Sequence, residues 1–335
     1  MIAGSHAGDY RLFGGYRLLL AWLVLTSHAS GYLPDWVAPL ALGNVGVFCF
    51  FVLSGFVIAE ACDRFYPAAP QRFLVNRLLR IYPTYWVACA IAVAVYVALG
   101  HPDLRLDAAS IAGNLVVVYA RPGTFFWISV IWAVGIELRF YFVAAVASAA
   151  MTLAKGRETL VQGAFAVGAL LLYVVTTASD FQRLATFRHA PFFVLGMALY
   201  YVVRSGSRRA AVLAAISLPL ALHSYWIYNS AGSGVPIGTT LAFGVALAPM
   251  LALAYVPVPA RVARVDKWLG DLTYPLYLVH WPIVYLFERV VPLQGGVGYL
   301  AIGAASLAAA TGMVLALEQP LMLVRDRVRR RRLYA

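Results

Sequence analysis

The stretch Arg17-Leu-Leu-Leu-Ala-Trp-Leu-Val-Leu-Thr-Ser-His28 opens the first long apolar run of the chain. Its composition is that of a membrane-spanning helix, yet it carries two ionisable side chains eleven residues apart. On a helix, eleven residues bring the chain about 20° past three full turns, so both side chains project from one face, about 16 Å apart. Because ionisable groups at membrane depth are costly, they indicate a functional site. Arg17 and His28 are therefore our first candidate catalytic residues.

The composition of the whole chain is that of an integral membrane protein. Of its 335 residues, 62% are hydrophobic and 12% are charged, whereas soluble domains have about 25% charged residues. Runs of about 17 to 25 mostly apolar residues, the length that crosses a bilayer, recur along the sequence. We predict an all-α polytopic membrane protein, in which residues 1–335 form a single membrane domain that ends in a short basic tail at about 321–335.

The net charge of +12 is compatible with nucleic-acid binding, but basic residues of a membrane protein concentrate in its cytoplasmic loops. We therefore expect no nucleic-acid partner, and we expect the arginine-rich tail to face anionic membrane lipid. The three cysteines, Cys49, Cys62 and Cys89, lie in or beside apolar runs without a CxxC spacing. They predict small core residues rather than a metal site or a disulfide.

The apolar runs predict about ten transmembrane helices, at 15–33, 40–61, 80–99, 127–151, 160–178, 190–204, 210–227, 237–256, 272–292 and 297–318. The short apolar segment 110–120 is predicted to be an interfacial or extracytoplasmic helix. With the N-terminus inside, 20 of the 26 lysines and arginines fall at cytoplasmic ends or in the tail. If 110–120 also crossed, the tail would face outward, against the positive-inside rule. Both termini are therefore predicted to be cytoplasmic.

Three titratable side chains are predicted to lie near the middle of the membrane. At 1.5 Å per residue, His28 lies about 16 Å into a hydrocarbon core of about 30 Å. Glu137 and His280 reach a similar depth from the ends of their own helices. In one interpretation the three meet at one level. The alternative, which we favour for His280, is that each is a buried polar group satisfied by a local partner.

These side chains suit proton transfer and acyl transfer. A neutral imidazole at His28 can take a proton from a hydroxyl, or accept an acyl group itself. A carboxylate beside it would fix its tautomer and stabilise the imidazolium. Arg17, near the inner surface, would pair with that carboxylate or hold an anionic donor. The alternative for Arg17 is an ordinary interfacial anchor.

A second candidate site is Arg77-Leu-Leu-Arg80-Ile-Tyr-Pro83, at the cytoplasmic start of the third span. Residues three apart share a helix face, so the two guanidiniums form a fork suited to phosphate. The alternative is positive-inside anchoring. In the second span, Ser54 and Gly55 allow close helix approach and a hydrogen bond, which on their own indicate packing.

Taken together, these stretches resemble the acyltransferase-3 family of integral membrane proteins. The resemblance runs from about Arg17 to Pro320 and rests on six short motifs that follow one another in the family's order. They are the Arg17-to-His28 spacing, Phe50-Phe-Val-Leu-Ser-Gly-Phe56, Arg77-Leu-Leu-Arg80-Ile-Tyr-Pro83, Trp132-Ala-Val-Gly-Ile-Glu137-Leu-Arg-Phe-Tyr141, Tyr274-Pro-Leu-Tyr-Leu-Val-His280-Trp-Pro282 and Glu318-Gln-Pro320.

The resemblance implies transfer of an acyl group, usually acetyl from cytoplasmic acetyl-CoA, to a hydroxyl of a glycan handled at the outer face of the bacterial inner membrane. In that family the histidine matching His28 is taken as catalytic, with the arginine matching Arg17 essential beside it. Residues matching Arg77 and Arg80 would bind the CoA phosphates, and we add Ser54 to this donor-binding set. Acetyl-CoA would be a co-substrate, so no permanently bound cofactor is expected, and the acceptor would be a carbohydrate or a lipid-linked glycan.

The chain departs from the family pattern at three positions. Gly14 stands where the family usually has an acidic residue, Phe48 stands where the second-span signature often has one, and Ala133 replaces the usual serine. An acidic partner for Arg17 or His28 must then come from elsewhere, and Glu137 is our candidate. Many relatives append a soluble esterase-like domain after the last helix, whereas we expect the standalone form here.

Two other classes of function stay open. A transporter or flippase also carries charged groups at mid-depth, but transporters commonly contain inverted repeats with interrupted helices, and the sequence shows no convincing repeat. A non-catalytic scaffold predicts that changing His28 leaves both acetylation and glycan export intact. The sequence indicates neither the acceptor glycan nor the oligomeric state.

Overall fold

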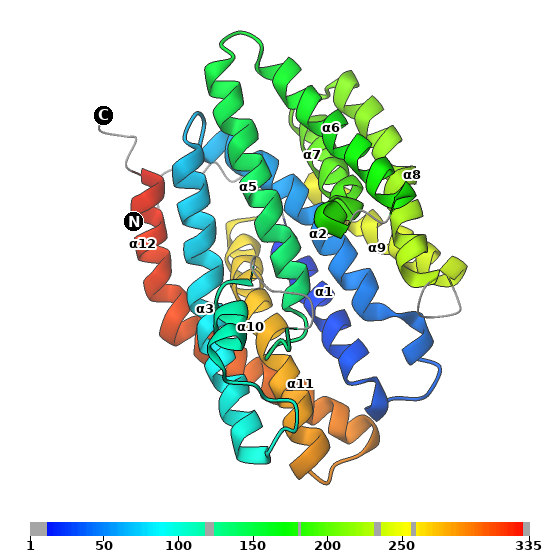
Figure 1. Cartoon of the computed structure of the whole chain (residues 1–335), viewed down its shortest axis with the longest axis vertical. Coiled ribbons are helices and arrows are strands. Elements are labelled where there is room, and N and C mark those ends of the chain that lie inside the picture. The colour runs from blue at the N-terminus through cyan, green and yellow to red at the C-terminus, as the bar shows by residue number, and fades with distance from the viewer. Residues whose placement is uncertain (1–11, 118–123, 180–181, 231–235, 256–258, 331–335) are drawn as a thin grey trace. The chain divides into compact units, whose positions relative to one another are not determined.

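The computed structural model describes residues 12–117, 124–179, 182–230, 236–255 and 259–330 (Figure 1). Every regular element among these residues is a helix, and none is a strand. The predicted interfacial segment 110–120 and the predicted tail 321–335 extend into 118–120 and 331–335, which lie outside the described residues.

The α-helices follow one another along the whole chain (Figure 1). They are α1 (Phe13–His28), α2 (Leu42–Glu60), α3 (Pro70–Leu99), α4 (Ala108–Leu115), α5 (Ile131–Leu153), α6 (Glu158–Ala178), α7 (Ala190–Ser205), α8 (Arg208–Ser230), α9 (Pro236–Tyr255), α10 (Ala260–Val290), α11 (Gly295–Met313) and α12 (Gln319–Arg330). The 3₁₀ segments are η2 (Ser30–Tyr32), η3 (Ala38–Leu40) and η6 (Gln182–His189), and the π-helical segments are η4 (Ala61–Phe65) and η7 (Val314–Glu318).

Within the described residues, seven helical segments are long and apolar enough to cross a membrane. They contain α2, α3, α5, α6, α8, α9 and the continuous stretch from α11 to α12. The prediction of an all-α polytopic membrane protein is confirmed. The helices α1 and α7 have 16 residues each, and α10 carries charged residues along its first half. The count of ten crossings therefore stays a prediction.

Several helices extend beyond the predicted spans. Helix α3 begins at Pro70 rather than at 80, and α10 begins at Ala260 rather than at 272. A helix can continue past the end of the hydrocarbon layer, whereas an apolar run marks only the part inside it. The predicted span 15–33 ends instead at His28, followed by the 3₁₀ turn η2. The described part of the predicted tail is helical, as α12.

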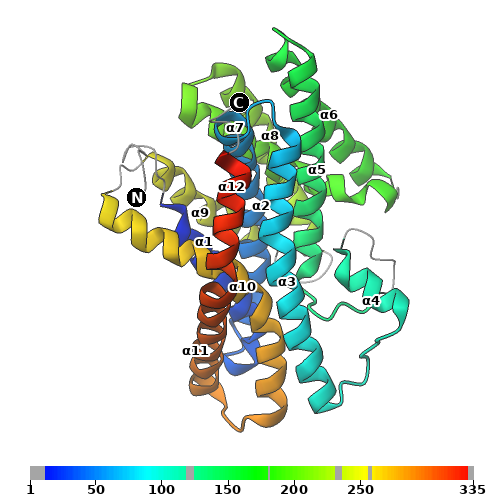
Figure 2. The ribbon, with the colours of Figure 1, turned by 90° about the vertical axis from the view of Figure 1, so that its left-hand side faces the viewer.

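The contacts within the chain divide it into two compact units. The first unit comprises residues 1–49, 83–131 and 233–319, and the second comprises 50–82, 132–232 and 320–335. In the first unit, α10 packs against α1 and α11 (Figure 2). In the second unit, α7 packs against α8 and α6. The single membrane domain expected over 1–335 stays a prediction.

Glycines permit close helix contacts within each unit. In the first unit, a Cβ atom on Gly14 of α1 would lie 1.7 Å from the carbonyl oxygen of Asp266 of α10. In the second unit, a Cβ atom on Gly55 of α2 would lie 2.1 Å from the carbonyl oxygen of Phe193 of α7. The predicted close approach at Gly55 is confirmed. Because a larger residue would overlap the neighbouring backbone, these glycines fix which helix faces touch.

Candidate active site

In the first unit, the predicted catalytic residue His28 lies against two residues of α10. His28 is the last residue of α1, and its ring centroid lies 5.4 Å from that of His280 and 4.9 Å from that of Trp281. The Trp281 ring stands nearly perpendicular to the imidazole, at 87°. Of the two titratable groups expected to meet His28, the structure brings His280 to it.

His280 is fully buried, and one of its two ring nitrogens is satisfied. Its Nδ1 lies 3.2 Å from the carbonyl oxygen of Leu276. Because a carbonyl oxygen only accepts, we assign the proton to Nδ1, which leaves a lone pair on Nε2. Nε2 has no hydrogen-bond partner in the part of the chain that the structure describes. The local partner expected for His280 therefore exists, but it leaves an acceptor nitrogen in the cluster with His28.

The start of α1, one turn before Arg17, is held by Asp266 of α10. The buried Asp266 carboxylate accepts hydrogen bonds from the backbone N–H groups of Gly14 and Gly15, at 2.7 Å each. It satisfies two of the four N–H groups that a helix start leaves unpaired, and it complements the helix dipole. Sequence reasoning missed Asp266. The available signal was the glycine pair itself, which leaves room for a carboxylate from a neighbouring helix.

In the second unit, Glu137 of α5 is the centre of a hydrogen-bonded cluster. It accepts hydrogen bonds from Ser54 of α2, at 2.7 Å, and from Tyr141, one turn further along α5. The guanidinium of Arg77 lies over the Tyr141 ring, 5.5 Å from its centroid, and over the Phe73 ring, 5.4 Å from its centroid. The structure thus joins three predicted site residues and adds Tyr141, to which sequence reasoning gave no role.

Arg77 is buried in this cluster, whereas Arg80, one turn further along α3, is partly exposed. The two rings hold the Arg77 guanidinium by cation–π attraction. Its Nε has no hydrogen-bond partner among the residues with described positions, so a donor group of Arg77 is left for an anionic ligand. This arrangement fits the phosphate-binding role predicted for Arg77 and Arg80, a role that stays a prediction.

The His28 cluster and the Glu137 cluster belong to different units. The pairing of Glu137 with Arg17 or His28 therefore stays a prediction. Within the first unit, a second buried carboxylate is Glu318, which accepts a hydrogen bond from Thr84. Glu318 ends the π-helical segment η7, and π-helical turns occur frequently at functional sites.

Comparison of the sequence with known proteins identifies the family of this chain. A family model described as "Acyltransferase domain" (Acyl_transf_3) matches residues 13–317. The exopolysaccharide production protein ExoZ of Rhizobium meliloti (strain 1021) is 27% identical over 307 residues, which cover 87% of this chain and 91% of that protein. The putative membrane-bound transacylase BcsY of Komagataeibacter xylinus is 25% identical over 303 residues, which cover 84% of this chain and 74% of that protein.

A third relative is nodulation protein 10 of Rhizobium leguminosarum bv. viciae, 24% identical over 379 residues, which cover 99% of this chain and 98% of that protein. No solved structure matches the chain. The family match includes every candidate site residue of both units, from Arg17 to His280. The chain therefore belongs to the acyltransferase-3 family and is a membrane acyltransferase.

Proposed function

We propose that this protein transfers an acyl group, acetyl in the first instance, from cytoplasmic acyl-CoA to a hydroxyl of a cell-surface or secreted carbohydrate at the bacterial inner membrane. The acyltransferase family supports this proposal, as do the names of two relatives, one an exopolysaccharide production protein and the other a putative transacylase. The observation that carries it is the contact of His28 with the buried His280. A base for acyl transfer needs an imidazole that is held in one orientation.

In the first version of the step, His28 is a general base. It removes the proton of the acceptor hydroxyl, the hydroxyl oxygen attacks the thioester carbon, the C–S bond breaks, and the proton passes to the leaving CoA sulfur. His28 would donate its other ring N–H to Nε2 of His280, whose proton Leu276 holds on Nδ1. His280 would then orient His28, as a carboxylate does in a Ser-His-Asp site, without placing a charge in the membrane.

In the second version, His28 carries the acyl group. A ring nitrogen of His28 attacks the thioester carbon, CoA leaves as its thiolate, and the acyl-imidazole then passes the acyl group to the acceptor oxygen, whose proton goes to the thiolate or to water. Brief incubation of the purified protein with radiolabelled acetyl-CoA, without acceptor, separates the two versions. Label that stays on the protein and is lost in His28→Ala supports the carrier. A protein without label supports the general base.

The Glu137 cluster would bind the acyl donor. Arg77 and Arg80 would hold the CoA phosphates by charge-assisted hydrogen bonds, with Arg77 kept in place by its two aromatic neighbours. Ser54 would act through Glu137, to which it is hydrogen-bonded. In this proposal Glu137 is also the acidic partner of the Arg17 and His28 pair, in place of the acidic residue that the family usually has before the motif arginine.

A strain that carries His28→Ala at normal protein levels tests the proposal. Acetyl content of the surface polysaccharide should fall to that of a deletion strain, while polysaccharide export continues. A matched control is His223→Ala, since His223 lies in the second unit with its Nδ1 2.7 Å from the Tyr173 hydroxyl. Full acetylation in the His28→Ala strain would contradict the proposal, and loss of export together with acetylation would favour a transporter.

A further inference from the structure

Helix α12 carries two arginines on the face that packs against the second unit. Arg325 and Arg329 are four residues apart, so they share one face of the helix. The backbone carbonyl of Arg325 accepts a hydrogen bond from the buried Asn76 of α3, at 3.0 Å. The Arg329 guanidinium lies over the Phe65 ring, 3.8 Å from its centroid. Arg327, two residues from each, is exposed and projects from the opposite side of α12.

The first turns of α3 and the helix α12 run antiparallel (Figure 1 and Figure 2). Because Arg325 lies level with Asn76, four further residues along each helix bring Arg329 level with Arg72. From Arg72 to Arg80, α3 rises about 12 Å. Arginines of both helices therefore follow one another along this contact. We call them the arginine row: Arg72, Arg77 and Arg80 of α3, and Arg325 and Arg329 of α12.

Three members of the arginine row act on one buried side chain, Tyr66, in the turn that leads into α3. Burial raises the pKa of the Tyr66 hydroxyl, and three positive charges oppose this rise, those of Arg77, Arg329 and Arg325. The negative charge of Asp326 adds to the rise. Three cations and one carboxylate thus surround this hydroxyl in the part of the chain that the structure describes. Like charges held this close repel one another, so the row favours an anion that neutralises them.

Two other carboxylates lie near the row, and both interact with groups outside it. Glu60 pairs with Arg64, at 3.3 Å. Asp63 accepts a hydrogen bond from Tyr200, at 2.6 Å, and lies 4.0 Å from Arg204. Neither Arg64 nor Arg204 belongs to the arginine row. The positive charge of the row is therefore not balanced by these carboxylates.

The row also contains donors that suit phosphate oxygens. Nη1 of Arg72 and Nε of Arg77 are buried and have no hydrogen-bond partner among the described residues. A buried donor without an acceptor costs free energy, which a phosphate oxygen would recover. Guanidiniums bind phosphates through charge-assisted hydrogen bonds. Arg329 is exposed, so a ligand can reach this end of the row from solvent. The row thus fits a ligand that carries several phosphates.

We propose that the arginine row binds CoA along its length, with the diphosphate on Arg77 and Arg80 and the 3′-phosphate of the nucleotide on Arg325 and Arg329. This inference rests on the proposed function, which supplies the donor. The pantetheine arm has to carry the acyl group into the membrane, so the nucleotide stays at the cytoplasmic end, where α12 ends in the predicted topology. Helix α12 then distinguishes CoA from a donor without the 3′-phosphate.

Calorimetric titration of the purified full chain in detergent with CoA and with dephospho-CoA tests this assignment. The unchanged protein should bind CoA more tightly than dephospho-CoA. Arg325→Gln and Arg329→Gln should each weaken CoA binding about tenfold, the loss expected for one charge-assisted hydrogen bond. Both should bind dephospho-CoA nearly as the unchanged protein does, because the phosphate that they contact is missing. Arg77→Gln should weaken the binding of both ligands.

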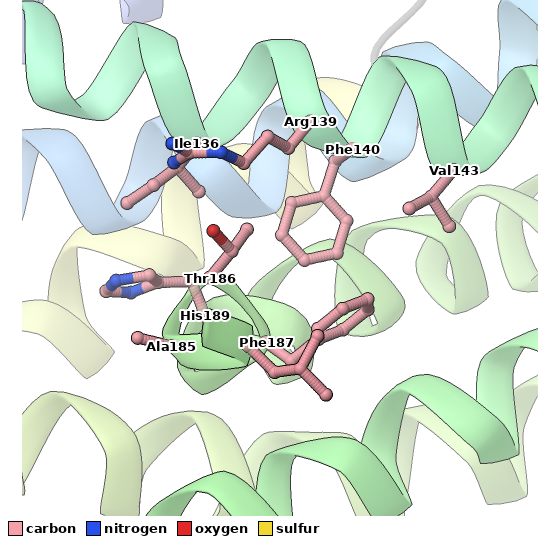
Figure 3. Close-up of a pocket in the computed structure, with 9 residues that line it drawn as sticks. Ile136, Arg139, Phe140, Val143, Ala185, Thr186, Phe187 and His189 are labelled. Carbon is pink, nitrogen blue, oxygen red and sulfur yellow. The ribbon is translucent and has the colours of Figure 1, made fainter. Parts of the chain in front are cut away.

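Two control variants lose the same charge outside the row. Arg327→Gln changes the opposite side of α12. Arg139→Gln changes an arginine of α5 that lines a hollow together with Thr186 and His189 of η6 (Figure 3). Both should bind the two ligands as the unchanged protein does. Arg325→Lys should keep part of the affinity for CoA, because a charge remains without the planar fork. Variants are compared only where the melting temperature is retained.

Several results would overturn the proposal. Equal weakening of CoA and dephospho-CoA binding in the α12 variants would show that Arg325 and Arg329 only hold the helix in place. Unchanged CoA binding in these variants, with fewer phosphatidylglycerol molecules bound in native mass spectrometry, would assign the two arginines to membrane lipid. Inorganic phosphate that displaces CoA as strongly as 3′,5′-ADP does would indicate an unspecific anion site.

The same titration separates this inference from the proposed function. An unchanged protein that binds no CoA would contradict the proposed donor, and the role of α12 with it. An unchanged protein that binds CoA, with equal affinity in Arg325→Gln and Arg329→Gln, would contradict the role of α12 alone.

Discussion

At the residue scale, the site depends on which donor or acceptor atom of each polar side chain remains available to a ligand. The Leu276 carbonyl oxygen is hydrogen-bonded to one ring nitrogen of His280, whose ring lies beside that of His28, and the other nitrogen has no partner among the described residues. The same holds for Arg77, whose guanidinium is packed between two rings while its Nε keeps an unused donor. A partner in the same helix or in a neighbouring helix thus fixes each side chain and leaves part of it for a ligand.

If Nε2 of His280 orients His28, then a side chain that restores an acceptor at this place should restore activity. We expect His280→Ala to lower the acyl-transfer rate about 100-fold, within the range of lost acid–base assistance, with little change in KM. His280→Gln should recover part of the rate, because its side-chain oxygen can accept a hydrogen bond. The measurement is the acyl-transfer rate of both purified variants as a function of pH. We expect the acid limb of the pH–rate profile to return in the Gln variant.

A purely structural role for His280 gives a different result. Removal of a fully buried side chain also leaves a cavity and costs stability, so melting temperatures of both variants are needed. If the Ala and Gln variants lose activity equally, and both keep the pH profile of the unchanged protein, His280 only fills space.

At the scale of the elements, α1 and α10 form the frame of the first cluster. They pack along much of their length, and two of their contacts are Gly14 with Asp266 and His28 with His280. Each helix advances fourteen residues between these two contacts, about 21 Å, so the helices run parallel and in step. The carboxylate at one end fixes the register that brings the two imidazoles together at the other.

Neighbouring glycines at the start of α1 test this frame. A Cβ atom on Gly14 would overlap the Asp266 backbone, whereas one on Gly15 would lie 3.3 Å from the Asp266 side chain and meets no backbone. We expect Gly14→Ala to lower the melting temperature, by the equivalent of about 1–3 kcal/mol for overpacking, and to lower activity with it. Gly15→Ala is the matched control and should change both only slightly. Equal tolerance of the two substitutions would show that the contact does not set the register.

At the scale of the whole molecule, the sequence predicted the elements better than their meeting points. Apolar runs predicted the helices because each buries its own backbone hydrogen bonds in the membrane. The spacing of Arg17 and His28 followed from helix geometry alone. The pairing of Ser54 with Glu137 and the capping of α1 by Asp266 depend on which helix faces touch, at Gly55 and Gly14. The glycines indicate where a close helix contact is possible, but the sequence does not indicate which residue of which helix lies opposite them.

The parallel packing of α1 and α10 also bears on the number of crossings. If both cross from the cytoplasm outward, an odd number of crossings must lie between them. This condition is met if seven helices between them cross, namely α2, α3, α5, α6, α7, α8 and α9. It fails if the short helix α4 also crosses, or if the 16-residue helix α7 does not. The register of two helices in one unit therefore supports ten crossings, in agreement with the charge bias of the loops.

Cysteine labelling from each side of the membrane tests this count. We expect Ser207→Cys, in the turn after α7, to react with a membrane-impermeant maleimide only in disrupted cells, as should Gly156→Cys in the turn after α5. Leu293→Cys, between α10 and α11, should react in intact spheroplasts. Cys62 is partly exposed and is replaced by serine in every variant, whereas Cys49 and Cys89 are buried. Labelling of Ser207→Cys from outside would mean that α7 does not cross. Such a result would contradict the parallel packing of α1 and α10, because the two helices would then enter the membrane from opposite sides.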